Sequence, residues 1–98
     1  MARRKKRKNF TKQTEVNTHL NPQVREKKLG RERNDGQQWS GTGKIDIDPR
    51  QTPRRYLNTL NHELLHLFFI DLNEDTTTLI ADRITDVLWK KGYRRIQL

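Results

Sequence analysis

The clearest pattern in the chain is a set of hydrophobic residues that recur at helical spacing after Thr52. These residues are Tyr56, Leu57, Leu60, Leu64, Leu67 and Phe68. Thr52 can cap a helix with its hydroxyl, and Pro53 suits the first turn because proline has no amide hydrogen to leave unpaired. We therefore predict a helix from Pro53 to about Ile70 that buries one apolar face.

A second helix is predicted after a short connection. Asn73 can cap it, and Glu74 and Asp75 then lie in its first turn, where the helix dipole favours negative charge. Gly92 is expected to end this helix, and residues 93–98 to form a short strand or a docked coil. The expected apolar stripe consists of Leu79, Ile80, Ile84, Val87 and Leu88.

Strict alternation of apolar and charged residues predicts one strand, Lys44–Asp48. Ile45 and Ile47 are expected to face the core, while Asp46 and Asp48 face solvent. A proline follows and should end the strand.

The N-terminal half gives weaker signals. Residues 14–20 alternate and suggest a strand, and Asn21-Pro22 and Asn34-Asp35-Gly36 are typical of turns. The polar segment 24–33 gives no assignment. Together these patterns predict an α+β domain, in which a small antiparallel or mixed sheet packs on the two helices.

The composition limits both the size of the core and the chemistry available to the chain. With 98 residues, of which 31% are hydrophobic and 34% charged, the chain fits one domain with a small core. It contains no cysteine, which excludes disulfides and thiolate metal sites. Any transition-metal site must therefore use histidine, aspartate and glutamate.

The net charge of +9 belongs to the N-terminal third. Residues 1–33 contain 12 Lys/Arg and 3 Asp/Glu, whereas residues 34–98 contain 9 of each. We expect residues 1–13 to be a disordered basic arm and residues 14–98 to be the folded domain. The arm is either a solubilising tail or, through residues 3–12, a contact for nucleic acid or another polyanion.

Nothing in the sequence indicates a membrane or a secretory route. No apolar run approaches the roughly 20 residues that a membrane-spanning helix needs. The basic N-terminus is not followed by the apolar segment of a secretory signal. We expect a cytoplasmic protein.

One motif in the first predicted helix carries chemistry. His62-Glu63-Leu64-Leu65-His66 follows the pattern His-Glu-x-x-His. Residues four apart share a helix face, so both imidazoles can reach one zinc ion. Glu63 points to the side, where it can act as general base towards a metal-activated water. The alternative, a buried helix with two satisfied histidines, makes a poor core because three adjacent polar groups need partners.

The sequence leaves the third metal ligand open. The first turn of the second helix can fold back over the motif, and Glu74 is preferred on this ground and, more strongly, on the family likeness described below. Asp82 is the next candidate, either as a ligand, as a solvated side chain or as a partner of a ligand imidazole. Asp75 and Asp86 follow, and His19 could approach from the N-terminal side. Tyr56, Tyr93 and Arg94 are available as oxyanion donors, and their spacing selects none of them.

The segment TLNHELLHLF, followed by a helix with an early glutamate, resembles the active-site pair of zincin metallopeptidases. It is most similar to short phage and bacterial members related to the SprT-like and ImmA/IrrE-like families. The likeness covers roughly residues 39–95 and includes KIDIDP, NED and LWKKGYRR. It implies a minimal zincin-like α+β fold whose strand 44–48 lies beside the cleft and pairs with an extended substrate. It also implies that His62 and His66 bind zinc, that Glu63 is the base and that Glu74 completes the site.

Two functions follow as hypotheses. The first is zinc-dependent hydrolysis of peptide bonds in a peptide or protein, in the host cytoplasm if the chain is phage-encoded. The second is a small basic nucleic-acid-binding protein with a structural or vestigial zinc site. Three protein ligands and an open position mark a catalytic zinc site, and no convincing fourth ligand lies near the motif, which favours the enzyme. The sequence indicates neither the substrate nor the oligomeric state.

Overall fold

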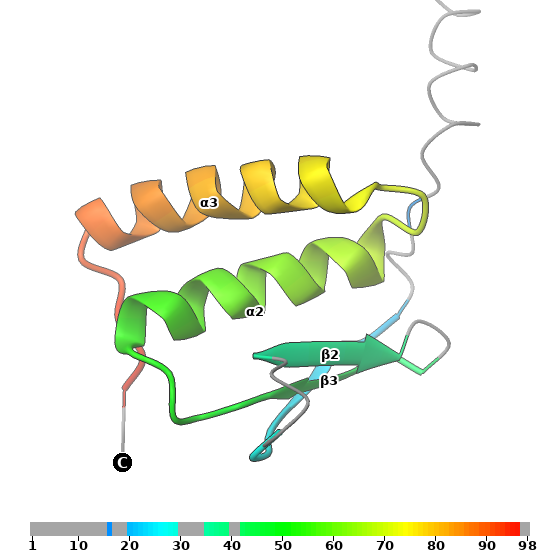
Figure 1. Cartoon of the computed structure of the whole chain (residues 1–98), viewed down its shortest axis with the longest axis horizontal. Coiled ribbons are helices and arrows are strands. Elements are labelled where there is room, and N and C mark those ends of the chain that lie inside the picture. Colours follow the sequence, from blue (N-terminus) through cyan, green and yellow to red (C-terminus); the bar gives the residue numbers. More distant parts are fainter. Residues whose placement is uncertain (1–15, 17–19, 30–34, 40–41, 97–98) are drawn as a thin grey trace, which may run out of the picture.

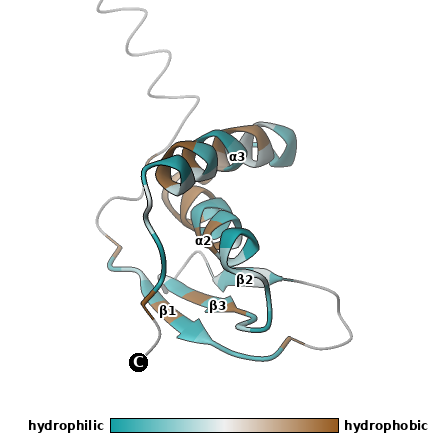
Figure 2. Ribbon diagram, turned by 90° about the vertical axis from the view of Figure 1, so that its left-hand side faces the viewer, coloured by the Kyte–Doolittle hydropathy of each residue, from teal (hydrophilic) through white to brown (hydrophobic). Residues whose placement is uncertain are grey.

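The computed structural model describes residues 16, 20–29, 35–39 and 42–96. Its elements are β1 (Gln23–Glu26), β2 (Gly36–Trp39), β3 (Lys44–Ile47), α2 (Pro53–Phe68) and α3 (Glu74–Lys90). The sheet, α2 and α3 form three successive layers (Figures 1 and 2). The predicted α+β class is confirmed. The predicted basic arm, residues 1–13, lies outside the described residues, as does His19.

The sheet is mixed, with strand order β1-β3-β2. The central strand β3 runs parallel to β1, with Val24 opposite Ile45, and antiparallel to β2, with Gln38 opposite Ile45. The predicted strand at 44–48 is therefore confirmed, but the expectation that it pairs with a substrate is wrong. Both of its edges are already hydrogen-bonded to neighbouring strands.

The sequence patterns did not reveal the two outer strands. The four residues of β1 are all exposed, and β2 is only half-buried. Neither strand therefore carries the alternation of apolar and polar residues by which a half-buried strand is recognised. Their strand conformation follows from backbone pairing to β3, which is a tertiary contact.

The expectation that Asp46 and Asp48 face solvent is also wrong. Ile45 and Ile47 are fully buried, as predicted, but Asp46 is 0% exposed and Asp48 only 7%. Arg25 donates to Asp46 through Nε at 2.9 Å and Nη2 at 3.1 Å, and these bonds hold the pKa of Asp46 below its ordinary value. Alternation gives the face of each residue, but it does not show that neighbouring side chains cover the outer face.

The core lies between the sheet and α2. Tyr56 and Leu67 are buried against Ile45 and Ile47, and Leu60 and Leu64 pack around them. Neither helix has the length and hydrophobicity that crossing a membrane requires, among the residues described.

The ends of α2 differ slightly from the prediction. The helix stops at Phe68 instead of Ile70, because Phe69 adopts an extended conformation and forms an antiparallel bridge with Val16. Pro53 occupies the first turn as expected. Thr52 stands at the N-cap, but its side chain makes no capping bond there.

The ends of α3 agree with the prediction. Asn73 Oδ1 accepts a hydrogen bond from the Thr76 amide at 2.8 Å, and Gly92 follows the helix with φ of 90°. Residues 93–96 form a coil without regular structure. Arg95 docks this coil by pairing with Glu26 of β1.

The predicted apolar stripe of α3 is only partly confirmed, because Ile80 and Leu88 are half-buried whereas Leu79, Ile84 and Val87 are exposed. The side chains buried on this helix are Thr77, Ala81 and Thr85, while Leu79 is 58% exposed and Val87 59%. Small and hydrogen-bonding residues bring α3 onto α2, so the helix is rotated away from the orientation that its hydrophobic pattern favours. This rotation fixes which carboxylates of α3 face α2.

Candidate metal centre

Three side chains from two helices meet at one end of the helical pair. His62 and His66 lie one turn apart near the end of α2, and Glu74 is the first residue of α3. The helices run antiparallel, so the first turn of α3 lies beside the last turns of α2 (Figure 1). Among the described residues, this is the group of histidines and carboxylates whose ligand atoms come within 4.8 Å of one another.

The carboxylate of Glu74 spans both imidazoles. Its Oε1 lies 2.8 Å from His66 Nε2 and its Oε2 lies 3.0 Å from His62 Nε2, while the two Nε2 atoms are 3.2 Å apart. The Glu74 side chain is 67% exposed. Its partial burial raises its pKa, but the two imidazoles lower it by more, so the carboxyl has a pKa below its ordinary value.

The residue types suit a zinc ion. Two imidazoles with one carboxylate are the ligand set of one class of catalytic zinc sites. Taken with one ligand atom from each residue, the three groups lie within 4.8 Å of one another. The contacts of 2.8 and 3.0 Å, which involve different oxygens of Glu74, are those of ordinary ion pairs. The residues therefore fit zinc in chemistry and lie close enough together to share one ion.

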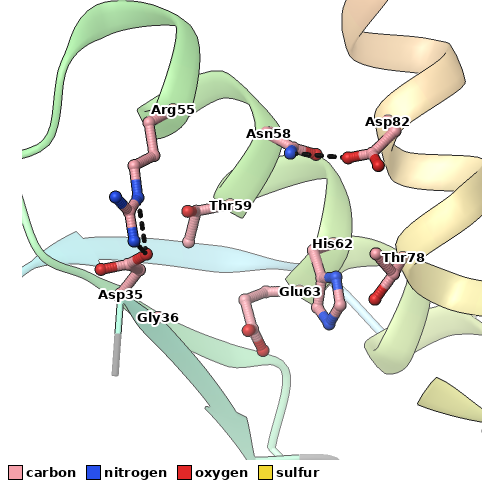
Figure 3. Close-up of a pocket in the computed structure, with 9 residues that line it drawn as sticks. All are labelled: Asp35, Gly36, Arg55, Asn58, Thr59, His62, Glu63, Thr78 and Asp82. Carbon is pink, nitrogen blue, oxygen red and sulfur yellow. Dashed lines mark hydrogen bonds and ion pairs between the residues drawn. The ribbon is translucent and has the colours of Figure 1, made fainter. Parts of the chain in front are cut away.

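Glu63 lies beside this group and does not join it. It follows His62 on α2 and lines the adjacent cleft (Figure 3). Burial raises the pKa of its carboxyl, and the negative charge of Glu74 adds to this effect, while His66 opposes it. A half-buried carboxylate with a raised pKa is a better proton acceptor than an exposed one.

Gly36 allows the edge strand β2 to approach this part of α2. A Cβ atom at this position would lie 2.6 Å from Thr59 Cγ2 and 3.1 Å from Glu63 Cγ. A larger residue at this position would force either the Thr59 side chain or the start of β2 to move. The glycine therefore keeps the edge of the sheet next to Glu63.

A cleft of 330 Å³ leads away from His62 and Glu63. One wall is α2, the other is α3, and the start of β2 forms the floor (Figure 3). The lining residues are Asp35, Gly36, Arg55, Asn58, Thr59, His62, Glu63, Thr78 and Asp82. Arg55 and Asp35 pair across the cleft at 2.7 Å. The cleft is lined largely by polar groups, which suits a peptide backbone better than an apolar ligand.

Comparisons with known proteins identify no relative: no family model, curated protein or solved structure matches the chain. What the protein does must therefore be inferred from its own residues.

The other carboxylates considered as ligands lie elsewhere. Asp82 accepts a hydrogen bond from Asn58 Nδ2 at 2.8 Å and lines the cleft instead of joining the group of three. Asp86 pairs with two basic side chains. Asp75 lies in the first turn of α3 outside the group, and the structure does not describe His19.

The three candidate oxyanion donors do not line this cleft. The Tyr56 hydroxyl donates to Glu26 on the sheet side of α2, and the Arg94 guanidinium lies 3.4 Å from the Trp89 ring centroid. Tyr93 lines a separate pocket, formed with residues from the start of α2 and the end of α3. None of these three residues is therefore assigned as the oxyanion donor.

Sequence reasoning missed the polar side chains of the cleft wall, although a signal was present. Asn58 and Thr59 precede His62 and Glu63 by four residues, and Arg55 precedes Thr59 by four. This is the spacing that places residues on one helix face. The residues that precede the motif by one or two helical turns therefore mark the wall of the cleft.

Proposed function

We propose that this protein is a zinc metallopeptidase in which His62, His66 and Glu74 hold the metal and Glu63 is the general base. The observation that carries the proposal is the convergence of one carboxylate on both imidazoles, at 2.8 and 3.0 Å. The likeness of the motif to zincin metallopeptidases agrees with it.

Zinc bound by these residues supplies a Lewis acid that polarises a carbonyl group and brings the pKa of water to about 7. Glu63 accepts the proton of the attacking water and returns it to the leaving amine. Its position in the cleft wall and its raised pKa suit both steps. The imidazoles of His62 and His66 act only as ligands.

The number of ligands favours catalysis over a structural site. The group contains three residues, and within the described ranges no fourth histidine or carboxylate joins it. Structural zinc sites use four protein ligands, whereas catalytic sites keep one position open. The nucleic-acid-binding alternative with a structural zinc therefore has less support.

An extended peptide is the substrate that the surroundings suit. In the described sheet the outer edge of β2 has no strand partner, and β2 begins at Gly36 on the cleft floor. A peptide can add to such an edge through backbone hydrogen bonds. This assigns to β2 the role that the family likeness gave to β3. We further propose a cytoplasmic location, and polyanion binding through residues 3–12.

The variant Glu63→Gln tests the assignment of the base. An amide fits the same space but does not accept the proton, so hydrolysis should fall to the level of a no-enzyme control while the zinc content stays at that of the wild type. Cleavage of unfolded casein by zinc-loaded protein is the assay. A Glu63→Gln protein that cleaves as fast as the wild type would exclude Glu63 as the base.

A further inference from the structure

One carboxylate in the cleft has a charge that no neighbouring side chain neutralises. Asp82 projects from α3 towards α2, and its Oδ1 accepts a hydrogen bond from Asn58 Nδ2 at 2.8 Å (Figure 3). In the part of the chain that the structure describes, its Oδ2 has no hydrogen-bond or ion-pair partner. The neutral amide of Asn58 donates to one oxygen of Asp82, but it leaves the negative charge of the carboxylate in place.

Two other carboxylates, Asp35 in the cleft lining and Asp86 beyond it, are already paired. Asp35 is held by Arg55 at 2.7 Å, and Asp86 is held by Arg54 at 3.3 Å and by Lys90 at 3.1 Å. The arginine of the lining, Arg55, and the neighbouring Arg54 are thus committed to other partners.

Two further charged groups lie close to Asp82. Arg83 is adjacent to it in sequence and lines a neighbouring pocket with it, but no ion pair joins the two side chains among the described residues. Glu63, on the opposite wall, is the proposed proton acceptor. Asp82 is therefore the carboxylate of this cleft that is left for a cation.

The position of Asp82 along the cleft determines which part of a bound peptide it can contact. Its partner Asn58 precedes His62 by one helical turn, which is about 6 Å along the helix axis. An extended peptide advances about 3.3 Å per residue. A substrate that presents a peptide bond to Glu63 and runs along α2 towards Asn58 therefore brings a side chain one or two residues away to the level of Asp82.

We propose that Asp82 selects substrates with a lysine or arginine one or two residues from the cleaved bond. This proposal rests on the peptidase function proposed above and adds a preference to it. The ammonium or guanidinium group donates a charge-assisted hydrogen bond to Oδ2 of Asp82, which stabilises the bound peptide. The chain thus takes basic segments of unfolded or flexible protein as its substrates.

Two substitutions separate the charge of Asp82 from its contact with Asn58. Asp82→Asn keeps an oxygen that accepts from Asn58 and removes only the charge. Asp82→Lys reverses the charge. The control is Asp86→Asn, which removes a carboxylate one turn further along the same helix and outside this cleft.

Cleavage sites in unfolded casein, mapped by mass spectrometry, give the preference of the wild type. Fluorogenic peptides built on the best site then carry lysine, norleucine or glutamate at the selected position. For the lysine peptide, Asp82→Asn should raise KM about fivefold with kcat unchanged, the effect of an exposed ion pair. The norleucine peptide should not distinguish the variant from the wild type, and Asp82→Lys should prefer glutamate. Asp86→Asn should behave as the wild type throughout.

The outcomes distinguish this proposal from the function on which it rests. Unchanged zinc content with an unchanged lysine preference in Asp82→Asn would overturn the role of Asp82 and leave the peptidase intact. If the wild type cleaves nothing, binding decides: the zinc-loaded protein should bind a fluorescein-labelled alanine-rich peptide with one central lysine about fivefold more tightly than the same peptide with norleucine in its place. Equal binding of the two peptides would overturn the proposal independently of hydrolysis.

Discussion

The two packed faces of α2 are built from different chemistry. Towards the sheet, Leu67 and its apolar neighbours are buried against Ile45 and Ile47. Towards α3, the buried partners are Thr77, Ala81 and Thr85. Hydrogen bonds link this second interface, from Asn61 to Thr85 at 3.0 Å, from Thr85 to Asn58 at 3.2 Å and from Asn58 to Asp82 at 2.8 Å.

Because of this difference, the interface with the sheet contributes most of the stability, whereas the interface with α3 fixes how the two helices lie on each other. Burial of apolar surface is strong and non-directional, so the sheet side holds α2 in place without fixing α3. Hydrogen bonds add only about 0.5–1.5 kcal/mol each, but they are directional. They fix how α3 lies on α2, and so where Glu74 meets His62 and His66. The candidate metal centre therefore lies at the weaker and more specific of the two interfaces.

The largest loss of stability is expected from a substitution at the apolar interface between α2 and the sheet. Leu67→Ala removes a fully buried side chain and should lower the free energy of unfolding by about 2–5 kcal/mol. The control is Leu79→Ala, the same substitution on the exposed side of α3, which should stay within about 0.5 kcal/mol of the wild type. Urea denaturation followed by circular dichroism measures both. Equal losses would show that the apolar stripe expected from the sequence is buried after all.

The proposed zinc ion should have the next largest effect, because its ligands would come from both helices. At a free concentration 100 times its dissociation constant, a ligand that binds only the folded state adds about 2.7 kcal/mol. Thermal melts with zinc and with EDTA should therefore differ in the wild type and coincide in Glu74→Ala. The difference should shrink on acidification, since the ligand atoms must be deprotonated to bind. A Glu74→Ala protein that zinc stabilises as much as the wild type would contradict the link between α3 and the metal.

A smaller loss of stability is expected from a substitution at the polar interface between α2 and α3. Asn61→Ala removes the donor to Thr85 and should cost about 1 kcal/mol in zinc-free protein. It should also weaken zinc binding several-fold, because α3 is then held less firmly in register. Arg83→Ala, at an exposed position of α3, serves as the control and should leave both quantities unchanged. If Asn61→Ala lowers stability without changing zinc affinity, the polar interface does not position Glu74.

The sequence predicted those parts of the fold whose signals are local. The strand at Lys44–Ile47 alternates, Pro53 and Asn73 mark the helix starts, and the His-Glu-x-x-His spacing identified two side chains on one helix face. The short connection to Asn73 also made it reasonable to expect Glu74 beside the motif. Each of these features depends on residues within one or two turns of each other.

The missed features depend on contacts between distant segments. The outer strands became strands by pairing with β3, and Arg25 covers Asp46 across 21 positions of sequence. The rotation of α3 likewise follows from hydrogen bonds to Asn58 and Asn61, which outweigh the exposure of Leu79. Hydrophobic periodicity alone could not show that a polar interface would decide the orientation of this helix.

Metal analysis of the purified, zinc-reconstituted protein tests the central claim most directly. We expect about one zinc per chain in the wild type, little or none in His62→Ala and Glu74→Ala, and a wild-type content in Asp82→Asn, which keeps the oxygen that accepts from Asn58. Elemental mass spectrometry after desalting gives the ratio of metal to protein. A wild-type protein that retains no zinc, or an Asp82→Asn protein that loses zinc while Glu74→Ala keeps it, would contradict the assignment of His62, His66 and Glu74 as the metal centre.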